Sequence, residues 1–270
     1  MLPPAMLATP PEAATPHRPQ DTQAVLPAPV LSVVVPVRNE EANIQPLIAE
    51  IRAALAGIGH EGGDHEIVYV DDGSTDGTAA QLLTAQATLP GVLVLRRHRR
   101  SCGQSAAVVT GVRAARGTWI VTLDGDGQND PADIPALFAR AQAGPGGLLL
   151  VAGHRTRRRD SWTKRQSSRV ANRVRAALLH DATPDTGCGL KVFRRAAFLE
   201  LPCFDHMHRY LPALFIRAGG QVVSVPVNHR PRTQGRSNYG TLDRLWVGLF
   251  DLVGVAWLQR RWKRPDIEQP

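Results

Sequence analysis

Short apolar runs alternate with longer amphipathic segments from residue 30 onward. The run VLSVVVPV at 30–37 is apolar at nearly every position, as a strand buried on both faces requires. The segment 40–56 that follows has apolar residues at helical spacing, at Ile44, Leu47, Ile48, Ile51 and Leu55. We therefore predict a strand, a tight turn and a helix as the first unit of the fold.

The same alternation continues along the chain and predicts an α/β fold. Further strands are expected at 66–70, 92–95, 118–123, 191–193 and 221–225. Helices are expected up to residue 86, at 104–115 and near 209–218. Alternating strands and helices favour a mostly parallel sheet flanked by helices, which is a Rossmann-like arrangement. In such sheets ligands bind beyond the carboxyl ends of the strands.

The two ends of the chain differ from this pattern. The first 29 residues carry eight prolines and have neither the basic nor the apolar region of a secretory signal, so 1–29 is predicted to be a disordered tail. The domain is predicted at 30–240, an apolar helix with a basic end at 241–264, and a short tail at 265–270. The longest apolar stretch, Leu245 to Leu258, would span about 21 Å as a helix, which is less than a bilayer core of about 30 Å.

Composition narrows the function classes. The chain has 270 residues, of which 43% are hydrophobic, 21% charged and 5% aromatic, as expected for one domain with an appendage. A net charge of +8 and a pI near 10.2 indicate a partner that is a phosphate or an anionic lipid. The three cysteines form no C-x-x-C motif, which excludes a zinc finger or disulfide scaffold and favours a reducing compartment.

Two acidic clusters follow two of the predicted strands. The first is DDGSTDGT at 71–78, and the second contains Asp124 and Asp126, whose i, i+2 spacing places both side chains on one side of an extended chain. Carboxylates in this arrangement can share a divalent cation, and hard oxygen ligands favour Mg²⁺ or Mn²⁺. The alternative is that these residues only form turns and helix caps, with Ser74 or Asp76 capping the next helix. Two such clusters together favour the cation, because their carboxylates repel one another without one.

Five motifs in order give the chain a resemblance to a known family. They are VVVPVRNEE at 33–41, VDDGSTDGT at 70–78, TLDGDGQNDP at 122–131, DTGCGLKVFRR at 185–195 and RPRTQGRSNYG at 230–240. Together they resemble the inverting family 2 glycosyltransferases of GT-A fold. The likeness is strongest to the polyprenyl-phosphate sugar transferases of the dolichyl-phosphate mannosyltransferase and undecaprenyl-phosphate type, and it extends from residue 30 to about 245.

The resemblance implies a site for a nucleotide sugar. Asp124 and Asp126 would form the D-x-D motif, with Asp126 binding the Mg²⁺ or Mn²⁺ that bridges the donor diphosphate and Gln128 as a further oxygen ligand. Asp72 would accept hydrogen bonds from the base or ribose. The remaining donor contacts implied by the resemblance are Pro36, Arg38 and Glu40 around the base and, in the loop 230–240, Arg232 and Ser237 on the phosphates.

A basic stretch suits a phosphate acceptor. Between residues 155 and 175 there are nine Lys or Arg and one acid, although a solvated helix face would have the same composition. The family resemblance places Arg155 and Arg165 on the lipid phosphate, with Arg169 as an alternative. A phosphate monoester has a second pKa near 6, so it needs no general base at neutral pH.

Asp185 has three possible roles. It could be a base, it could orient the acceptor, or it could only cap the turn before Gly187 and Gly189.

The C-terminal stretch ends in the basic and aromatic sequence QRRWKR. Trp262 lies between Arg260, Arg261, Lys263 and Arg264, which is typical of an anchor at an anionic membrane surface. The alternative is a helix that packs on the domain or on another subunit.

Three functions follow from these observations. The leading hypothesis is a metal-dependent inverting transferase that moves a hexose, mannose or glucose, from GDP-mannose or UDP-glucose to a polyprenyl phosphate at the cytoplasmic membrane face. The second keeps the fold but transfers the sugar to a saccharide hydroxyl, which requires a carboxylate base. The third is nucleic-acid binding, which the low aromatic content and acidic strand ends disfavour. The chain has no P-loop or G-x-G-x-x-G motif, which argues against an ATPase or a dinucleotide oxidoreductase.

Overall fold

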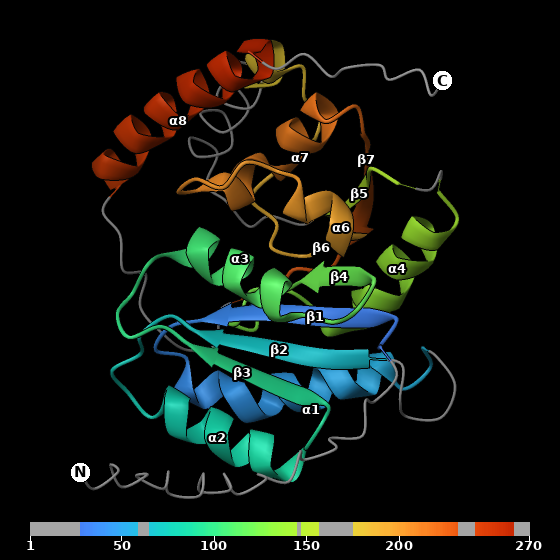
Figure 1. Cartoon of the computed structure of the whole chain (residues 1–270), viewed down its shortest axis with the longest axis vertical. Coiled ribbons are helices and arrows are strands. Elements are labelled where there is room, and N and C mark those ends of the chain that lie inside the picture. Colours follow the sequence, from blue (N-terminus) through green and yellow to red (C-terminus); the bar gives the residue numbers. More distant parts are fainter. Residues whose placement is uncertain (1–27, 59–64, 145–146, 157–174, 232–240, 262–270) are drawn as a thin grey trace, which may run out of the picture.

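The computed structural model describes residues 28–58, 65–144, 147–156, 175–231 and 241–261, and these form a twisted sheet with helices on both faces (Figure 1). The sheet has seven strands in the order β3-β2-β1-β4-β6-β5-β7. The strands are β1 Leu31–Val37, β2 His65–Asp71, β3 Leu93–Arg97, β4 Trp119–Thr122, β5 Leu149–Arg155, β6 Lys191–Arg194 and β7 Gln221–Val227. All pairs are parallel except those of β6, so the expected α/β architecture is confirmed.

The helices divide into two groups, one on each face of the sheet. One face carries α1 Ile44–Leu55, α2 Thr78–Thr88 and α4 Ile134–Gln142, together with the 3-10 turns η1 Glu41–Asn43 and η2 Pro131–Asp133. The other face carries α3 Gln104–Ala114, α6 Arg195–Leu199, α7 Met207–Arg217 and α8 Thr241–Arg261. Each group buries its apolar residues in a separate core against the sheet.

Strand β1 shows why its sequence is apolar throughout. Val33 and Val35 belong to the core under α1, whereas Val34 belongs to the core under α3. Successive side chains of a strand point to opposite faces, so a central strand covered on both sides has no solvated position. Helix α3 comes close to β1 at Gly111, where an added Cβ would lie 2.4 Å from a methyl carbon of Val34.

Strand β6 runs antiparallel between β4 and β5. Its first residue, Lys191, pairs with Thr122 at the end of β4 and with Ala152 of β5. Because β6 runs in the opposite direction, the segment that leads into it, 185–190, lies at the carboxyl ends of its neighbours. The motif DTGCGLK therefore meets the D-x-D motif at one edge of the sheet.

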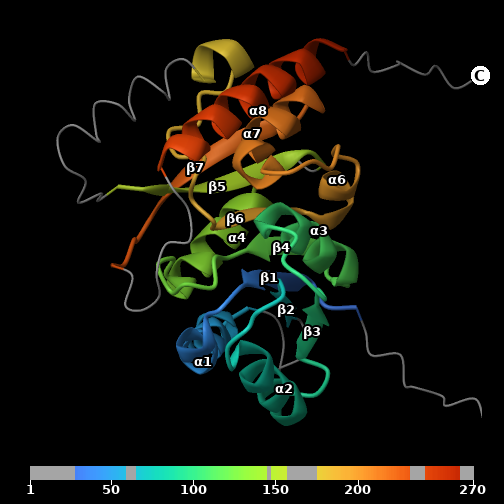
Figure 2. The ribbon, with the colours of Figure 1, turned by 90° about the vertical axis from the view of Figure 1, so that its left-hand side faces the viewer.

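Strand β5 and helices α4 and α6 were not predicted from the sequence. The expected C-terminal helix is present and packs on the domain. Helix α8 lies across α7, far from α1 and α2 (Figure 2). It buries Leu252, Val255 and Ala256 and exposes an apolar surface formed by Leu249, Phe250, Val253 and Trp257.

Polar contacts hold α8 on α7. The Tyr210 hydroxyl donates to the Gly248 carbonyl over 3.1 Å, and Arg217 Nε donates to the Leu258 carbonyl over 3.0 Å. His206, just before α7, pairs with Asp251 over 2.9 Å. Among the described residues no helix has both the length and the apolar character needed to cross a bilayer.

Candidate active site

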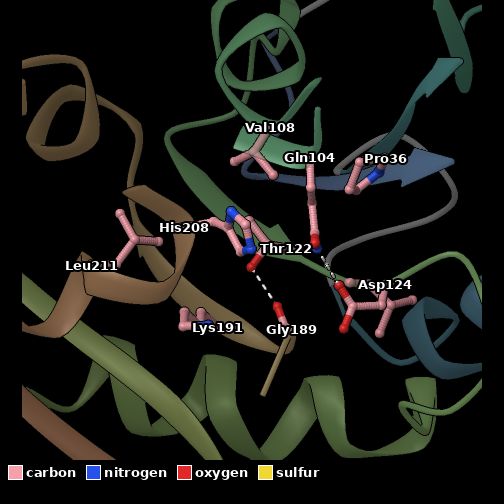
Figure 3. Close-up of a pocket in the computed structure, with 10 residues that line it drawn as sticks. Pro36, Gln104, Val108, Thr122, Asp124, Gly189, Lys191, His208 and Leu211 are labelled. Atoms are coloured by element: carbon pink, nitrogen blue, oxygen red, sulfur yellow. Dashed lines mark hydrogen bonds between the residues drawn. The ribbon is translucent and has the colours of Figure 1, made fainter. Parts of the chain in front are cut away.

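The acidic residues singled out in the sequence lie at one edge of the sheet, where β2 and β4 end. Asp72 follows β2, and Asp124 and Asp126 follow β4. Pro36 lies near the end of β1 and lines a pocket next to Asp124 (Figure 3). The segment before β6 closes the same region, because the Thr122 hydroxyl donates to the Gly189 carbonyl over 2.7 Å.

The surroundings of Asp124 fit a divalent cation. Gln104 Nε2 donates to Asp124 Oδ1 over 2.8 Å (Figure 3), and an added Cβ on Gly189 would lie 2.2 Å from the Asp124 carboxyl carbon. Burial, followed by the negative charge of Asp126, raises the pKa of Asp124 to about 6. Two carboxylates that repel each other at the end of a strand are a hard-oxygen donor set, as Mg²⁺ or Mn²⁺ requires.

Gln128, the expected third metal ligand, lies in the same loop. Its backbone N–H donates to Asp126 Oδ1 over 3.1 Å, and its carbonyl accepts from the Arg230 backbone N–H over 2.9 Å. The D-x-D loop is thus linked to the segment that follows β7. Arg230 strengthens this link by pairing with both Asp130 and Glu50, each over 2.6 Å.

Asp72 is engaged by the loop that follows β3. Its Oδ1 accepts from the Cys102 backbone N–H over 2.8 Å and lies 2.7 Å from His98 Nδ1. Its Oδ2 accepts from the Ser101 hydroxyl over 2.7 Å and from the Gly103 backbone N–H over 2.9 Å. A carboxylate has about four lone-pair positions, so a nucleotide base or ribose would have to replace one of these bonds to contact Asp72.

The other residues expected around the base lie in and after β1. Arg38 is exposed, whereas Glu40 is buried and accepts from Asn43 Nδ2 over 2.6 Å. Four further predicted site residues lie outside the described residues, so the structure gives them no position. They are Arg165, Arg169, Arg232 and Ser237.

Arg155 and Asp185, predicted separately, are brought together. Arg155 Nε donates to Asp185 Oδ2 over 2.7 Å, and Nη2 donates to Oδ1 over 2.8 Å. The backbone N–H of Arg155 also donates to Asp185 Oδ2, over 3.2 Å. Both side chains are largely buried. Asp185 therefore positions the end of β5, and any role as a base would require it to leave this pair.

Two residues that the sequence reasoning did not single out line the pocket beside Asp124. Lys191 comes from β6 and His208 from α7, and both side chains line this pocket (Figure 3). Lys191 is 3% exposed, and burial lowers its pKa. Burial and the charge of Lys191 lower the pKa of His208 to about 3, so its ring is neutral at physiological pH. Lys191 belongs to the motif at 185–195, which the sequence does reveal. Its side chain faces the pocket only because β6 runs antiparallel to its neighbours, and the sequence does not show this.

The chain resembles known proteins over most of its length. Residues 32–201 match the family model "Glycosyl transferase family 2". The chain is 33% identical over 242 residues to a dodecaprenyl-phosphate galacturonate synthase of Rhizobium johnstonii, an alignment that covers 87% of this chain and 69% of that protein. It is 34% identical to an undecaprenyl-phosphate 4-deoxy-4-formamido-L-arabinose transferase of Enterobacter, with 83% of this chain and 66% of that one covered.

A solved structure shares the fold. The chain superposes on glucosyl-3-phosphoglycerate synthase from Mycobacterium tuberculosis, solved with Mn²⁺, UDP and phosphoglyceric acid, with a TM-score of 0.64. The sequences are 20% identical, and the match covers 87% of this chain and 80% of that one. The likeness supports the arrangement of sheet and helices described above.

Proposed function

The chain belongs to glycosyl transferase family 2, and we propose that it transfers a sugar from a nucleotide sugar to a polyprenyl phosphate with inversion at the anomeric carbon. The observation that carries this proposal is the placement of Asp124 and Asp126 at the end of β4, beside the Asp72 loop. Support also comes from relatives at 33% and 34% identity, whose names specify dodecaprenyl and undecaprenyl phosphate.

The proposed reaction needs electrostatic help more than proton transfer. A phosphate oxygen of the acceptor bonds to the anomeric carbon while the bond from that carbon to the donor diphosphate breaks, and the nucleoside diphosphate leaves with the electron pair. Asp124, Asp126 and Gln128 would hold a Mg²⁺ or Mn²⁺, which when bound offsets the negative charge of the leaving group. The attacking phosphate is a dianion at neutral pH, so no side chain has to remove a proton.

The alternative acceptor, a saccharide hydroxyl, is disfavoured by the contacts of the candidate base. A hydroxyl needs a carboxylate positioned to take its proton. Asp185 instead accepts a hydrogen bond from the Arg155 guanidinium on each carboxylate oxygen, so it would have to leave this pair to act as the base. A phosphate acceptor avoids this requirement.

The range of sugars to be tested is wider than mannose and glucose. One relative is named for galacturonate and another for 4-deoxy-4-formamido-L-arabinose. The donor panel for this chain therefore includes GDP-mannose, UDP-glucose and UDP-galacturonate.

We place the reaction at the cytoplasmic surface of an anionic membrane, with α8 as the contact. Phe250, Val253 and Trp257 are 73%, 60% and 58% exposed and form one side of the helix. Arg260 and Arg261 lie in its last turn. An apolar face next to cationic residues is the pattern of a helix that lies in the bilayer interface.

The test is transfer of labelled sugar from each donor to undecaprenyl phosphate in the presence of Mn²⁺. The proposal predicts label in the organic phase with at least one donor and none with Asp126→Ala. Label that enters only soluble saccharides would replace the proposal with the hydroxyl-acceptor alternative. Full activity of Asp126→Ala would remove the metal role.

A further inference from the structure

Lys191 is a buried lysine that has no close anionic partner among the described residues. Its side chain lines the pocket beside Asp124 and is 3% exposed. Nζ donates to the Cys188 carbonyl, which uses one of its three N–H groups. Within the described part of the chain no carboxylate lies at ion-pair distance from Nζ, although the fields of Asp124 and Asp185 reach it. Burying an ammonium in this way is costly unless an anion completes the site.

His208 supplies a second donor to the same pocket. The Ser105 hydroxyl oxygen accepts from the His208 backbone N–H over 3.2 Å and lies 2.7 Å from the ring Nδ1. We assign the hydroxyl proton to the bond with Nδ1, and in this tautomer the ring proton lies on Nε2. The neutral ring thus presents an N–H group to the pocket from α7, opposite the Lys191 ammonium on β6 (Figure 3).

We propose that Lys191 and His208 form an oxyanion subsite beside the D-x-D motif, and that this subsite receives the phosphate of the acceptor lipid. The identity of the acceptor rests on the proposed function, whereas the presence of an oxyanion subsite rests on the two donors alone. Val108 and Leu211 contribute apolar side chains to the lining of the same pocket.

Position favours the acceptor phosphate over a carboxylate on the donor sugar. The attacking oxygen must reach the anomeric carbon, next to the diphosphate that the cation holds at Asp126. The pocket is bounded by Asp124, which is two residues before Asp126 in the sequence. On its other side it is bounded by α7, the helix against which α8 packs. Arg155, the acceptor ligand implied by the family resemblance, already has its guanidinium fork on Asp185.

The kinetic test separates the two substrates. Lys191→Met removes the charge and keeps the length of the side chain, Lys191→Arg keeps the charge, and Arg52→Met removes an exposed cation on α1 as the matched control. We expect Lys191→Met to raise KM for undecaprenyl phosphate roughly 10- to 100-fold, as loss of a charge-assisted hydrogen bond does. KM for the donor stays within about twofold in all variants, because the cation at Asp126, and not Lys191, would hold the donor diphosphate. Lys191→Arg and Arg52→Met stay near wild type.

A binding test does not depend on turnover. Farnesyl phosphate is titrated into the protein in a calorimeter, with inorganic phosphate as a competitor. We expect binding by the wild type, weakening of roughly tenfold or more in Lys191→Met, and displacement by phosphate. If no donor supports transfer but this binding depends on Lys191, the proposed function fails while the subsite stands.

Three results would overturn the inference. One is a folded Lys191→Met protein with unchanged KM and unchanged farnesyl phosphate affinity. The second is a defect in Lys191→Met that appears with UDP-galacturonate but not with UDP-galactose, at unchanged lipid KM, which would assign the anion to the sugar. The third applies if Lys191→Met does not fold. His208→Phe, which removes the N–H and keeps a ring, is then measured in its place, and unchanged lipid binding by that variant would overturn the inference.

Discussion

Arg155 and Asp185 form a two-pronged ion pair that joins the end of β5 to the segment before β6. The two bonds are 2.7 and 2.8 Å long, and the side chains are 15% and 5% exposed. The pair fixes where the DTGCGLK segment enters the site and, through Gly189, how it lies against Asp124. It also assigns a positioning function to two residues that the family resemblance had given separate roles.

Breaking this pair should lower the free energy of unfolding, because the pair has a structural role. Asp185→Ala leaves a buried guanidinium without its partner, and such losses cost roughly 3–5 kcal/mol in the free energy of unfolding. Because Arg155→Met removes the same interaction, the double variant should lose less than the sum of the single losses. Urea denaturation of the four proteins measures both effects. A stable Asp185→Asn protein without turnover would instead identify Asp185 as the base.

Asp124→Asn should stabilise the metal-free protein at neutral pH. The pKa of Asp124 is raised from 3.8 to about 6, so between these values the folded state binds more protons than the unfolded state. Its contribution to stability is then present at low pH and is lost as the pH rises through 6, by up to roughly 3 kcal/mol. Asparagine does not titrate and should avoid this loss.

Thermal or urea unfolding in EDTA between pH 4 and 8 measures the difference between the two proteins. We expect this difference in the free energy of unfolding to grow as the pH rises toward 7. In a separate titration without EDTA, we expect the variant to lose Mn²⁺ binding. A difference that stays constant with pH would show that Asp124 is not perturbed in this way.

The apolar surface of α8 should bind vesicles. Phe250→Asp or Trp257→Asp places a carboxylate where the helix would contact lipid, and we expect weaker sedimentation with anionic liposomes. Leu83→Asp is the matched control, because Leu83 is 56% exposed on α2, at the other end of the molecule. Equal vesicle binding by all three variants and the wild type would indicate that this surface packs against protein instead.

Arg230 should influence metal binding through the D-x-D loop. It pairs with Asp130 and Glu50, and its backbone N–H donates to the Gln128 carbonyl. Because the guanidinium is partly exposed, Arg230→Met should change the free energy of unfolding by about 1 kcal/mol or less. We expect a higher apparent Kd for Mn²⁺, measured by calorimetry, and little recovery in Arg230→Lys, since one ammonium cannot span both carboxylates. Unchanged Mn²⁺ affinity would confine Arg230 to a structural role.

Much of the fold was predictable because central strands and amphipathic helices leave strong periodic signals. The apolar run at β1 and the spacing of Ile44, Leu47 and Ile51 correspond to a strand and helix whose ends differ from the prediction by a few residues. Strand β5 and helices α4 and α6 were missed. The short helix α4 begins after a proline-containing 3-10 turn, and β5 directly precedes the basic stretch that drew the interpretation toward a helix.

The site was predictable only in part, because its second half depends on topology. Asp124 and Asp126 follow an apolar strand and could be assigned to its carboxyl end from the sequence alone. Lys191 faces the same pocket only because β6 is inserted antiparallel between β4 and β5, and His208 only because α7 crosses above it. No periodicity in a single sequence specifies such pairings between distant segments.

The most direct test of the account is the mass of the lipid product. Wild-type protein, Mn²⁺ and undecaprenyl phosphate are incubated with each donor, and the organic phase is analysed by mass spectrometry beside the amount of nucleoside diphosphate released. The account predicts, for at least one donor, a lipid whose mass exceeds that of undecaprenyl phosphate by one sugar residue, in equal amount to the nucleotide released. Nucleotide release with every donor but without a glycosylated lipid phosphate would contradict it.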